Sequence, residues 1–220
     1  METGSTFTAE SMHSVHACRY ADKIGILGGS FDPVHIAHID IAMQAYAQFS
    51  LQKILLIPLG LPPHKPEGLA PAQDRLEMLH IATQNKDYLE PCAVEIERPG
   101  YTYTVDTLME LKKRYGDDTE LHYIVGADTL FELESWKRHE EVFRLCEFIC
   151  FYRPGYDLQK IMEQLRRLRE KYGKLIQIAR YEGIDISSTR IREMARAGQD
   201  LSALVPYGVA QYIMKKGLYR

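Results

Sequence analysis

The chain has 220 residues, of which 45% are apolar and 26% charged, values typical of a globular protein with a substantial core. Its formal charge of −3 at pH 7 gives no overall basic surface, so nucleic acid is not an expected partner. The sequence has no run of about 18 apolar residues, so we expect no membrane span.

Residues 1–21 are polar and lack the apolar core of a secretion signal. We expect them to form a flexible leader ahead of one domain at residues 22–220. The four cysteines show no CxxC spacing, which favours reduced thiols in a cytoplasmic protein over a zinc site. The sequence leaves the oligomeric state open, with a homo-oligomer among the alternatives.

Short apolar runs alternate with helical patterns along the rest of the chain. Strands are predicted at residues 23–27, 53–58, 93–97, 120–125, 147–152 and 175–178. Helices are predicted at residues 36–49, 72–83, 105–115, 136–145 and 158–172, with two C-terminal helices at 187–196 and 206–216. Continuous apolar runs are typical of parallel strands buried on both faces. This order predicts an α/β fold with a single doubly wound, Rossmann-like parallel sheet and C-terminal helices.

The segment between the first strand and the first helix has the sequence GGSFDPVHIAH, residues 28–38. Its glycines let the main chain approach an anion, and the helix start offers free N–H groups. His35 and His38 face one side of the first turn, where imidazoles can donate hydrogen bonds to phosphate oxygens. The candidate nucleotide-binding residues here are Gly28, Gly29, Ser30, Phe31, His35 and His38, with His35 and His38 at the phosphates.

Residues 28–38 resemble GGSFDPxHxGH, the opening motif of the bacterial nicotinate mononucleotide adenylyltransferases in the (H/T)xGH nucleotidylyltransferase superfamily. The family glycine between the two histidines is Ala37 here. Alanine keeps helical geometry, so we expect it to be tolerated, although its methyl group limits how closely a phosphate can pack. Together with four further motifs in family order, the resemblance covers residues 23–218.

Residues 186–192, ISSTRIR, resemble the family's ISST(x)IR signature. A Ser-Ser-Thr start provides capping hydroxyls and free amides, and Arg192 offers a guanidinium fork for triphosphate oxygens. Taken alone, the segment is typical of a capped helix. Paired with the glycine segment, it indicates that ATP is bound by Ile186, Ser188, Thr189 and Arg192, with adenine near Ile186.

Three intervening segments resemble the family's mononucleotide-binding motifs. The loop after the second strand resembles PxxPHK, where His64 and Lys65 would reach the mononucleotide phosphate, unless it is a solvated proline loop. Residues 98–108 resemble RxGxSYTxDTL, with Thr102 in place of the usual serine. Free amides near Thr104 would hold the pyridine carboxylate, a role compatible with simple helix capping.

The third of these segments, residues 126–136, resembles GAD/GGD…W. Asp128 would bind a ribose hydroxyl, and Trp136 would stack on the pyridine ring beside Lys137. The alternative is a core tryptophan that opens an amphipathic helix.

The resemblance implies adenylyl transfer from ATP to nicotinate mononucleotide, giving deamido-NAD and pyrophosphate in NAD biosynthesis. The substrate phosphate is already a nucleophile, so positioning and electrostatic stabilisation would suffice, with His35, His38 and Arg192 as catalytic residues. Mg²⁺ would arrive on the triphosphate, with no protein metal site.

Two alternatives stay open. One is a phosphopantetheine-using nucleotidylyltransferase, although that family usually carries threonine at the place of His35. The other is a catalytically silent nucleotide-binding regulator on the same fold. A GxGxxG dinucleotide motif and a P-loop are both absent from the sequence.

Overall fold

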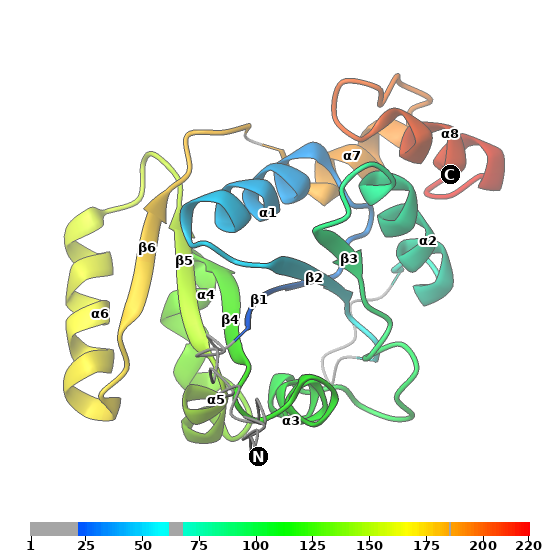
Figure 1. The fold of residues 1–220 in the computed structure, drawn as a ribbon. Helices are drawn as coiled ribbons and strands as arrows, with labels where there is room; N and C mark the ends of the chain where they lie inside the picture. Colours follow the sequence, from blue (N-terminus) through cyan, green and yellow to red (C-terminus); the bar gives the residue numbers. More distant parts are fainter. Residues whose placement is uncertain (1–21, 62–67, 185) are drawn as a thin grey trace, which may run out of the picture.

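The computed structural model describes residues 22–61, 68–184 and 186–220. These ranges form a six-stranded parallel sheet in the order β3-β2-β1-β4-β5-β6, with helices on both faces (Figure 1). The order reverses direction between β1 and β4, which defines the switch point of a doubly wound sheet. The predicted fold class is confirmed.

Continuous apolar runs form the central strands because helices cover both of their faces. The strands are β1 (Lys23–Gly29), β2 (Lys53–Pro58), β3 (Leu89–Pro91), β4 (Glu120–Gly126), β5 (Glu147–Tyr152) and β6 (Ile176–Arg180). Gly28 pairs with Ile57 of β2, and Ile26 pairs with Tyr123 of β4. The carboxyl ends of β1, β2 and β4 therefore lie at the same edge of the sheet.

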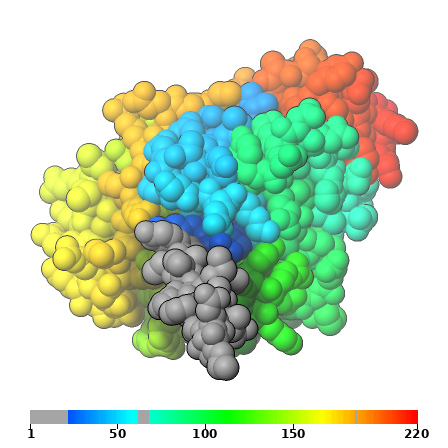
Figure 2. All heavy atoms as spheres, in the orientation of Figure 1, coloured from blue at the N-terminus to red at the C-terminus, as the bar shows by residue number. Residues whose placement is uncertain are grey.

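The helices divide between two hydrophobic clusters, one on each face of the sheet. One cluster packs beneath α1 (Ile36–Gln48), α2 (Ala72–Thr83), α7 (Ser188–Arg196) and α8 (Tyr207–Lys216). The other packs beneath α3 (Thr104–Tyr115), α4 (Ala127–Glu132), α5 (His139–Leu145) and α6 (Leu158–Tyr172). The C-terminal helices thus share a face with α1, and in the space-filling view they lie beside α2 (Figure 2).

The third strand lies earlier in the chain than predicted. Residues 93–97 do not form a strand, since Glu97 N–H donates to Ala93 O in a turn. The strand is β3, whose Leu89 pairs with Ile54 of β2. Val94 and Glu95 are both buried without belonging to the sheet, which explains the apolar pattern that suggested a strand.

The predicted helix at residues 136–145 begins later, at His139. Trp136 has extended backbone and Arg138 adopts a left-handed conformation with φ of 55°, so neither continues a helix. A short helix that was not predicted, α4, follows β4 directly and leads into a 3-10 turn, η1 (Leu133–Ser135).

No helix within the described ranges combines the length and the apolar character needed to cross a bilayer. The predicted leader at residues 1–21 lies outside the described residues, as do His64 and Lys65.

Candidate active site

The glycine segment connects the end of β1 to the start of α1 at the switch point of the sheet. A Cβ atom at Gly28 would lie 2.4 Å from the Tyr123 hydroxyl oxygen, so only glycine fits without a shift. Phe31 is buried in a left-handed conformation with φ of 46°, and its ring lies edge-on to His38 at 5.0 Å between centroids. The main chain is thus held close to both histidines.

The two histidines form a stacked pair at the start of α1. Their ring centroids are 3.6 Å apart with an interplanar angle of 14°. The main-chain N–H of His35 donates to Nδ1 of His38 at 3.3 Å, which assigns the His38 proton to Nε2. The Nδ1 atom of His35 is buried and has no hydrogen-bond partner within the described part of the chain.

Both histidines are neutral at neutral pH in this structure. Burial, assisted by the charge of Arg153, lowers the pKa of His35 from 6.5 to about 4. Burial, with smaller effects of His35 and Arg153, lowers the pKa of His38 well below 6.5. A bound anion stabilises the protonated form of a neighbouring imidazole, so polyphosphate at this place would raise both pKa values.

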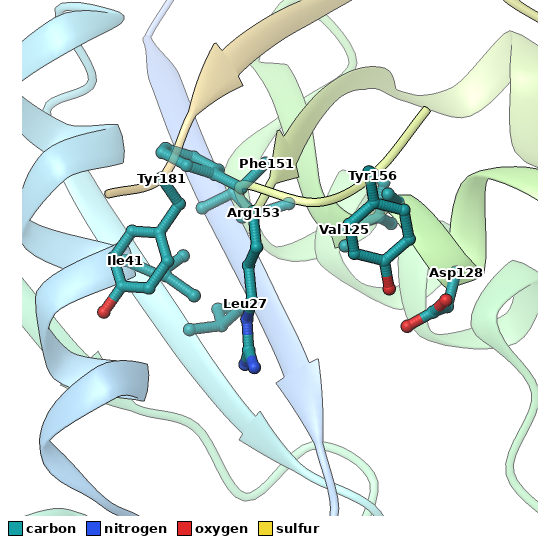
Figure 3. A pocket seen from close by; sticks show the side chains of 11 residues that line it. Leu27, Ile41, Val125, Asp128, Phe151, Arg153, Tyr156 and Tyr181 are labelled. Carbon is teal, nitrogen blue, oxygen red and sulfur yellow. The ribbon is translucent and has the colours of Figure 1, made fainter. Parts of the chain in front are cut away.

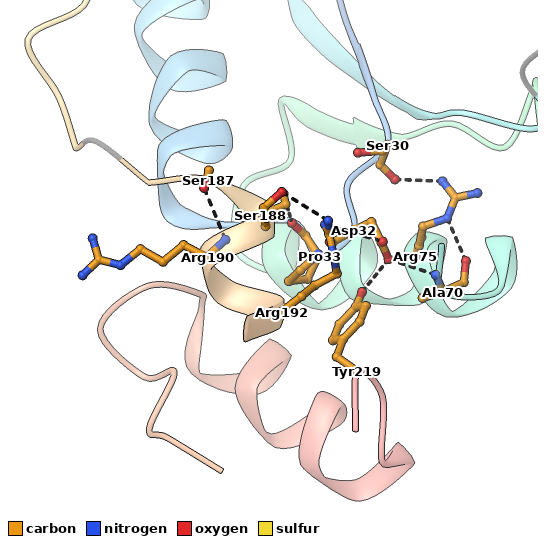
Figure 4. Close-up of polar contacts among 11 residues, drawn as sticks. Ser30, Asp32, Pro33, Ala70, Arg75, Ser187, Ser188, Arg190, Arg192 and Tyr219 are labelled. Carbon is orange, nitrogen blue, oxygen red and sulfur yellow. Dashed lines mark hydrogen bonds and ion pairs between the residues drawn. The ribbon is translucent and has the colours of Figure 1, made fainter. Parts of the chain in front are cut away.

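Helix α7 lies directly against the glycine segment (Figure 4). Ser188 Oγ donates to Pro33 O at 3.1 Å, and Arg192 Nη1 donates to Asp32 O at 2.8 Å. Arg192 Nη2 also donates to Thr189 Oγ1 at 3.2 Å. The two sequence motifs, at opposite ends of the chain, therefore meet in space.

Two buried charged residues, Asp32 and Arg75, make hydrogen bonds that hold the glycine segment in place. Asp32 is 1% exposed, and its Oδ1 accepts hydrogen bonds from Ala70 N at 3.0 Å and from Tyr219 Oη at 2.7 Å. Arg75 is 2% exposed and donates to three main-chain carbonyls. Those acceptors are Ser30 O at 2.8 Å, Leu59 O at 2.7 Å and Ala70 O at 3.1 Å.

A cavity of about 200 Å³ opens at the carboxyl ends of β1, β4 and β5. Figure 3 shows Arg153 extending into it between Tyr181 on one side and Tyr156 and Asp128 on the other. The charge of Arg153 also lowers the pKa of both His35 and His38, so its guanidinium acts electrostatically on the histidine pair. Cationic and apolar walls suit a nucleotide, which has an anionic and an aromatic part.

The candidate base-binding residues lie at the starts of α3 and α4 and at the end of η1, elements that pack on the opposite face of the sheet from α1 and α7. Thr104 is the first residue of α3, and Lys137 Nζ lies 3.6 Å from the ring centroid of Tyr103 at that helix start. Trp136 is half-buried and meets the ring of Tyr123 edge-on at 5.5 Å. Asp128, in the first turn of α4, is exposed and lines the cavity with Tyr156 (Figure 3).

Comparison with known proteins agrees with this geometry. The model of the cytidylyltransferase-like family matches residues 26–194. A relative from Thermoanaerobacter sp. (strain X514), described as a probable nicotinate-nucleotide adenylyltransferase, is 39% identical over 90% of this chain and 94% of its own. One of the same description from Desulfitobacterium hafniense (strain Y51) is 40% identical over 90% and 96%. The chain belongs to the nicotinate-nucleotide adenylyltransferase family.

Solved structures share the fold of this adenylyltransferase. Plasmodium falciparum nicotinic acid mononucleotide adenylyltransferase, in a complex with NaAD, superposes with a TM-score of 0.74. The match has 20% identity and covers 90% of this chain and 97% of that one. At this identity the likeness establishes the architecture, while residue roles rest on the site itself.

The structure brings most of the predicted site residues to one edge of the sheet and adds two findings that the sequence analysis did not anticipate. Ala37 is 1% exposed and belongs to the core, so its methyl group contacts protein and does not line the open site. Arg153, Asp32 and Arg75 were not predicted as site residues. Arg153 directly follows β5 at the edge where the motifs lie, and Arg75 interrupts an apolar helix face; both signals were available in the sequence.

Proposed function

We propose that this adenylyltransferase transfers the adenylyl group of ATP to nicotinate mononucleotide, releasing pyrophosphate. The observation that carries the proposal is the contact between Arg192 and the main chain of Asp32, at 2.8 Å. This contact places a guanidinium and the amides of an α-helix start beside the histidine pair. Anionic oxygens can then be contacted from both sides at once.

On this proposal the triphosphate lies between the two motifs. His35 and His38 contact the phosphates from the start of α1, with His38 directed toward the departing pyrophosphate. Ser188, Thr189 and Arg192 hold the β and γ groups. Arg153 adds a further positive charge from the end of β5, and adenine lies against Gly28, Gly29 and Ile186.

The histidines supply hydrogen bonds without needing to transfer a proton. The 5′-phosphate of the mononucleotide is the nucleophile; it attacks the α-phosphorus, and the bond to the β-phosphate oxygen breaks. Negative charge moves onto the leaving pyrophosphate during this step. An imidazole N–H that gains positive character beside that charge stabilises the transition state more than the ground state.

Mg²⁺ belongs to the ATP substrate in this proposal. The imidazoles and the Arg192 guanidinium around the glycine segment suit phosphate oxygens, and the Asp32 carboxylate there already contacts Ala70, Tyr219 and Arg192. Within the described ranges, no group of three or more His, Cys, Asp or Glu side chains could hold a metal ion. The triphosphate oxygens would therefore carry the ion into the site.

The mononucleotide is proposed to bind across the switch point. Free amides at the start of α3 near Thr104 hold the pyridine carboxylate, with Lys137 close by. Trp136 packs against the pyridine ring, Asp128 binds a ribose hydroxyl, and His64 and Lys65 reach the 5′-phosphate. Because the reaction consumes ATP and feeds NAD formation, the proposed location is the cytoplasm.

A single assay tests the function. The purified chain is mixed with Mg·ATP and, in separate reactions, with nicotinate mononucleotide, nicotinamide mononucleotide or phosphopantetheine, and pyrophosphate release is followed. We expect the fastest release with nicotinate mononucleotide. Faster release with phosphopantetheine would assign the chain to a different reaction, and no release with any acceptor would indicate a nucleotide-binding regulator.

A further inference from the structure

The C-terminal segment reaches the phosphate side of the site through one tyrosine. Tyr219 follows α8 and Gly217, where the helix ends in a left-handed turn. Tyr219 itself has φ of 66°, a conformation that costs free energy for a bulky residue and persists only when its contacts hold it. Its hydroxyl donates to Asp32 Oδ1 at 2.7 Å, across 187 residues of sequence.

Asp32 connects this hydroxyl to Arg192. The carboxylate is buried, and its other oxygen, Oδ2, lies 3.7 Å from Arg192 Nη1. Oδ2 has no hydrogen-bond partner in the described part of the chain, so this ion pair is its main polar contact there. The same guanidinium nitrogen donates to the Asp32 carbonyl oxygen at 2.8 Å. Arg192 thus contacts Asp32 through both the carbonyl and the carboxylate, while Thr189 Oγ1 accepts from Nη2 (Figure 4).

We propose that Tyr219 is a positioning residue for ATP, which holds Asp32 so that Arg192 faces the triphosphate. This inference rests on the proposed function, because it assigns Arg192 to the phosphates. Without the hydroxyl, Asp32 Oδ1 keeps only the bond from Ala70 N, and the carboxylate gains freedom to rotate. The guanidinium then samples orientations that do not bind phosphate, and ATP binds more weakly.

The chain offers a matched control in the same C-terminal segment. Tyr212 of α8 is also half-buried, and its hydroxyl donates to Asp74 Oδ1 at the same distance of 2.7 Å. Asp74 lies on α2 and has an ion pair with Lys216, not with a residue of the proposed site. Tyr212→Phe thus removes the same atom from the same kind of bond, without touching the Asp32–Arg192 pair.

The experiment compares Tyr219→Phe with Tyr212→Phe in the full chain. For Tyr219→Phe we expect the KM for ATP and the Kd for Mg·ATP to rise about fivefold, because the loosened Asp32 carboxylate disorders the Arg192 guanidinium without removing it. The KM for nicotinate mononucleotide should change by less than about twofold, because the proposed mononucleotide site is unchanged. Tyr212→Phe should change neither constant, although the thermal midpoints of both variants should fall by similar amounts.

The coupling to Arg192 is tested by combining substitutions. In an Arg192→Lys background, where the fork is already lost, Tyr219→Phe should weaken Mg·ATP binding by less than about twofold. Equal effects in the two backgrounds would overturn the proposal. So would equal rises in both KM values, an effect of Tyr212→Phe as large as that of Tyr219→Phe, or unfolding of Tyr219→Phe alone.

The two proposals fail in distinguishable ways. If the unmodified chain releases no pyrophosphate, the proposed reaction is wrong, and the Mg·ATP titration still measures whether Tyr219 acts on ATP binding. If the unmodified chain is active and Tyr219→Phe binds ATP normally, only the role of Tyr219 is wrong. A variant that ends at Leu218 checks the same contact by removing the whole side chain, and normal ATP affinity in it would also contradict the proposal.

Discussion

The phosphate side of the site, around His35 and Arg192, and the base side, around Thr104 and Trp136, are held by different kinds of contact. On the phosphate side, hydrogen bonds to main-chain carbonyls and to the buried Asp32 carboxylate join segments up to 187 residues apart. On the base side, Trp136 meets the ring of Tyr123 edge-on and Lys137 lies over the ring of Tyr103.

This difference matters because hydrogen bonds fix direction, whereas ring contacts tolerate small displacements. A reacting triphosphate needs fixed donors, since misplaced groups forfeit transition-state stabilisation. A pyridine ring needs a shaped surface and one anchor for its carboxylate. We therefore expect substitutions on the phosphate side to act on turnover and folding, and changes on the base side to act on substrate choice.

The largest effect is expected for His38→Ala. Loss of one donor at the site of developing charge should lower kcat at least about 100-fold. Steady-state pyrophosphate release measures the rate, and circular dichroism should show an unchanged fold. Unchanged turnover in a folded variant would show that His38 has no part in the mechanism. It would also contradict the expectation that the phosphate side acts on turnover and the base side on substrate choice.

The next largest effect is expected for Arg75→Lys, which tests folding on the phosphate side. An ammonium cannot reproduce the three hydrogen bonds that the buried guanidinium makes to Ser30, Leu59 and Ala70. We expect the free energy of unfolding in urea to fall by about 2–3 kcal/mol. Arg169→Lys, at an exposed position of α6, is the control and should change it by less than about 0.5 kcal/mol.

The histidine pair should make the fold sensitive to acid. The pKa of His35 is about 4 in the folded chain and near 6.5 when unfolded, so below pH 6.5 the unfolded state binds more protons. Stability is therefore complete above pH 6.5 and is lost as the pH falls toward 4, by roughly 2–3 kcal/mol for this residue. His38, with its pKa lowered in the same direction, adds to the loss.

Urea unfolding between pH 7 and pH 4.5 measures this loss in the unmodified chain and in a His35→Asn/His38→Asn variant. Burial also lowers the pKa of His122, which stays in both chains, so the difference between their slopes isolates the pair. Identical slopes would show that the buried histidines are not the acid-sensitive groups.

The smallest effect is expected on the base side, as a preference among substrates. The free amides at the start of α3 favour a carboxylate over a neutral amide. Nicotinate mononucleotide should exceed the nicotinamide form by more than about tenfold in kcat/KM, measured at saturating Mg·ATP. Comparable values for the two substrates would place the pyridine carboxylate elsewhere.

The sequence predicted the elements whose signal is local. The runs at residues 54–57 and 147–152 are apolar enough to identify buried strands, and α2 and α6 begin and end as predicted. The third strand was misplaced because β3 has only three residues, and its position depends on pairing with β2. The start of α5 was misplaced because Arg138 adopts a left-handed conformation that nothing nearby in the sequence requires.

The same distinction applies to the site. Family-like motifs identified His35, His38 and Arg192, which the structure brings to one edge of the sheet. The contacts behind Arg192 could not be identified, since Asp32 meets Arg192 and Tyr219 only after the chain has folded. Buried polar partners of this kind have no local pattern, because their spacing in sequence is set by the whole topology.

The two sides of the site are also connected by van der Waals contacts that run from Gly28 through Tyr123 to Trp136. A methyl group at Gly28 would have to displace the Tyr123 hydroxyl, and the ring of Tyr123 leans on the indole of Trp136. A displacement caused by alanine at position 28 would thus be transmitted to Trp136, the proposed pyridine contact. Positions 28 and 123 should therefore tolerate exchange only as a pair, for instance alanine together with phenylalanine.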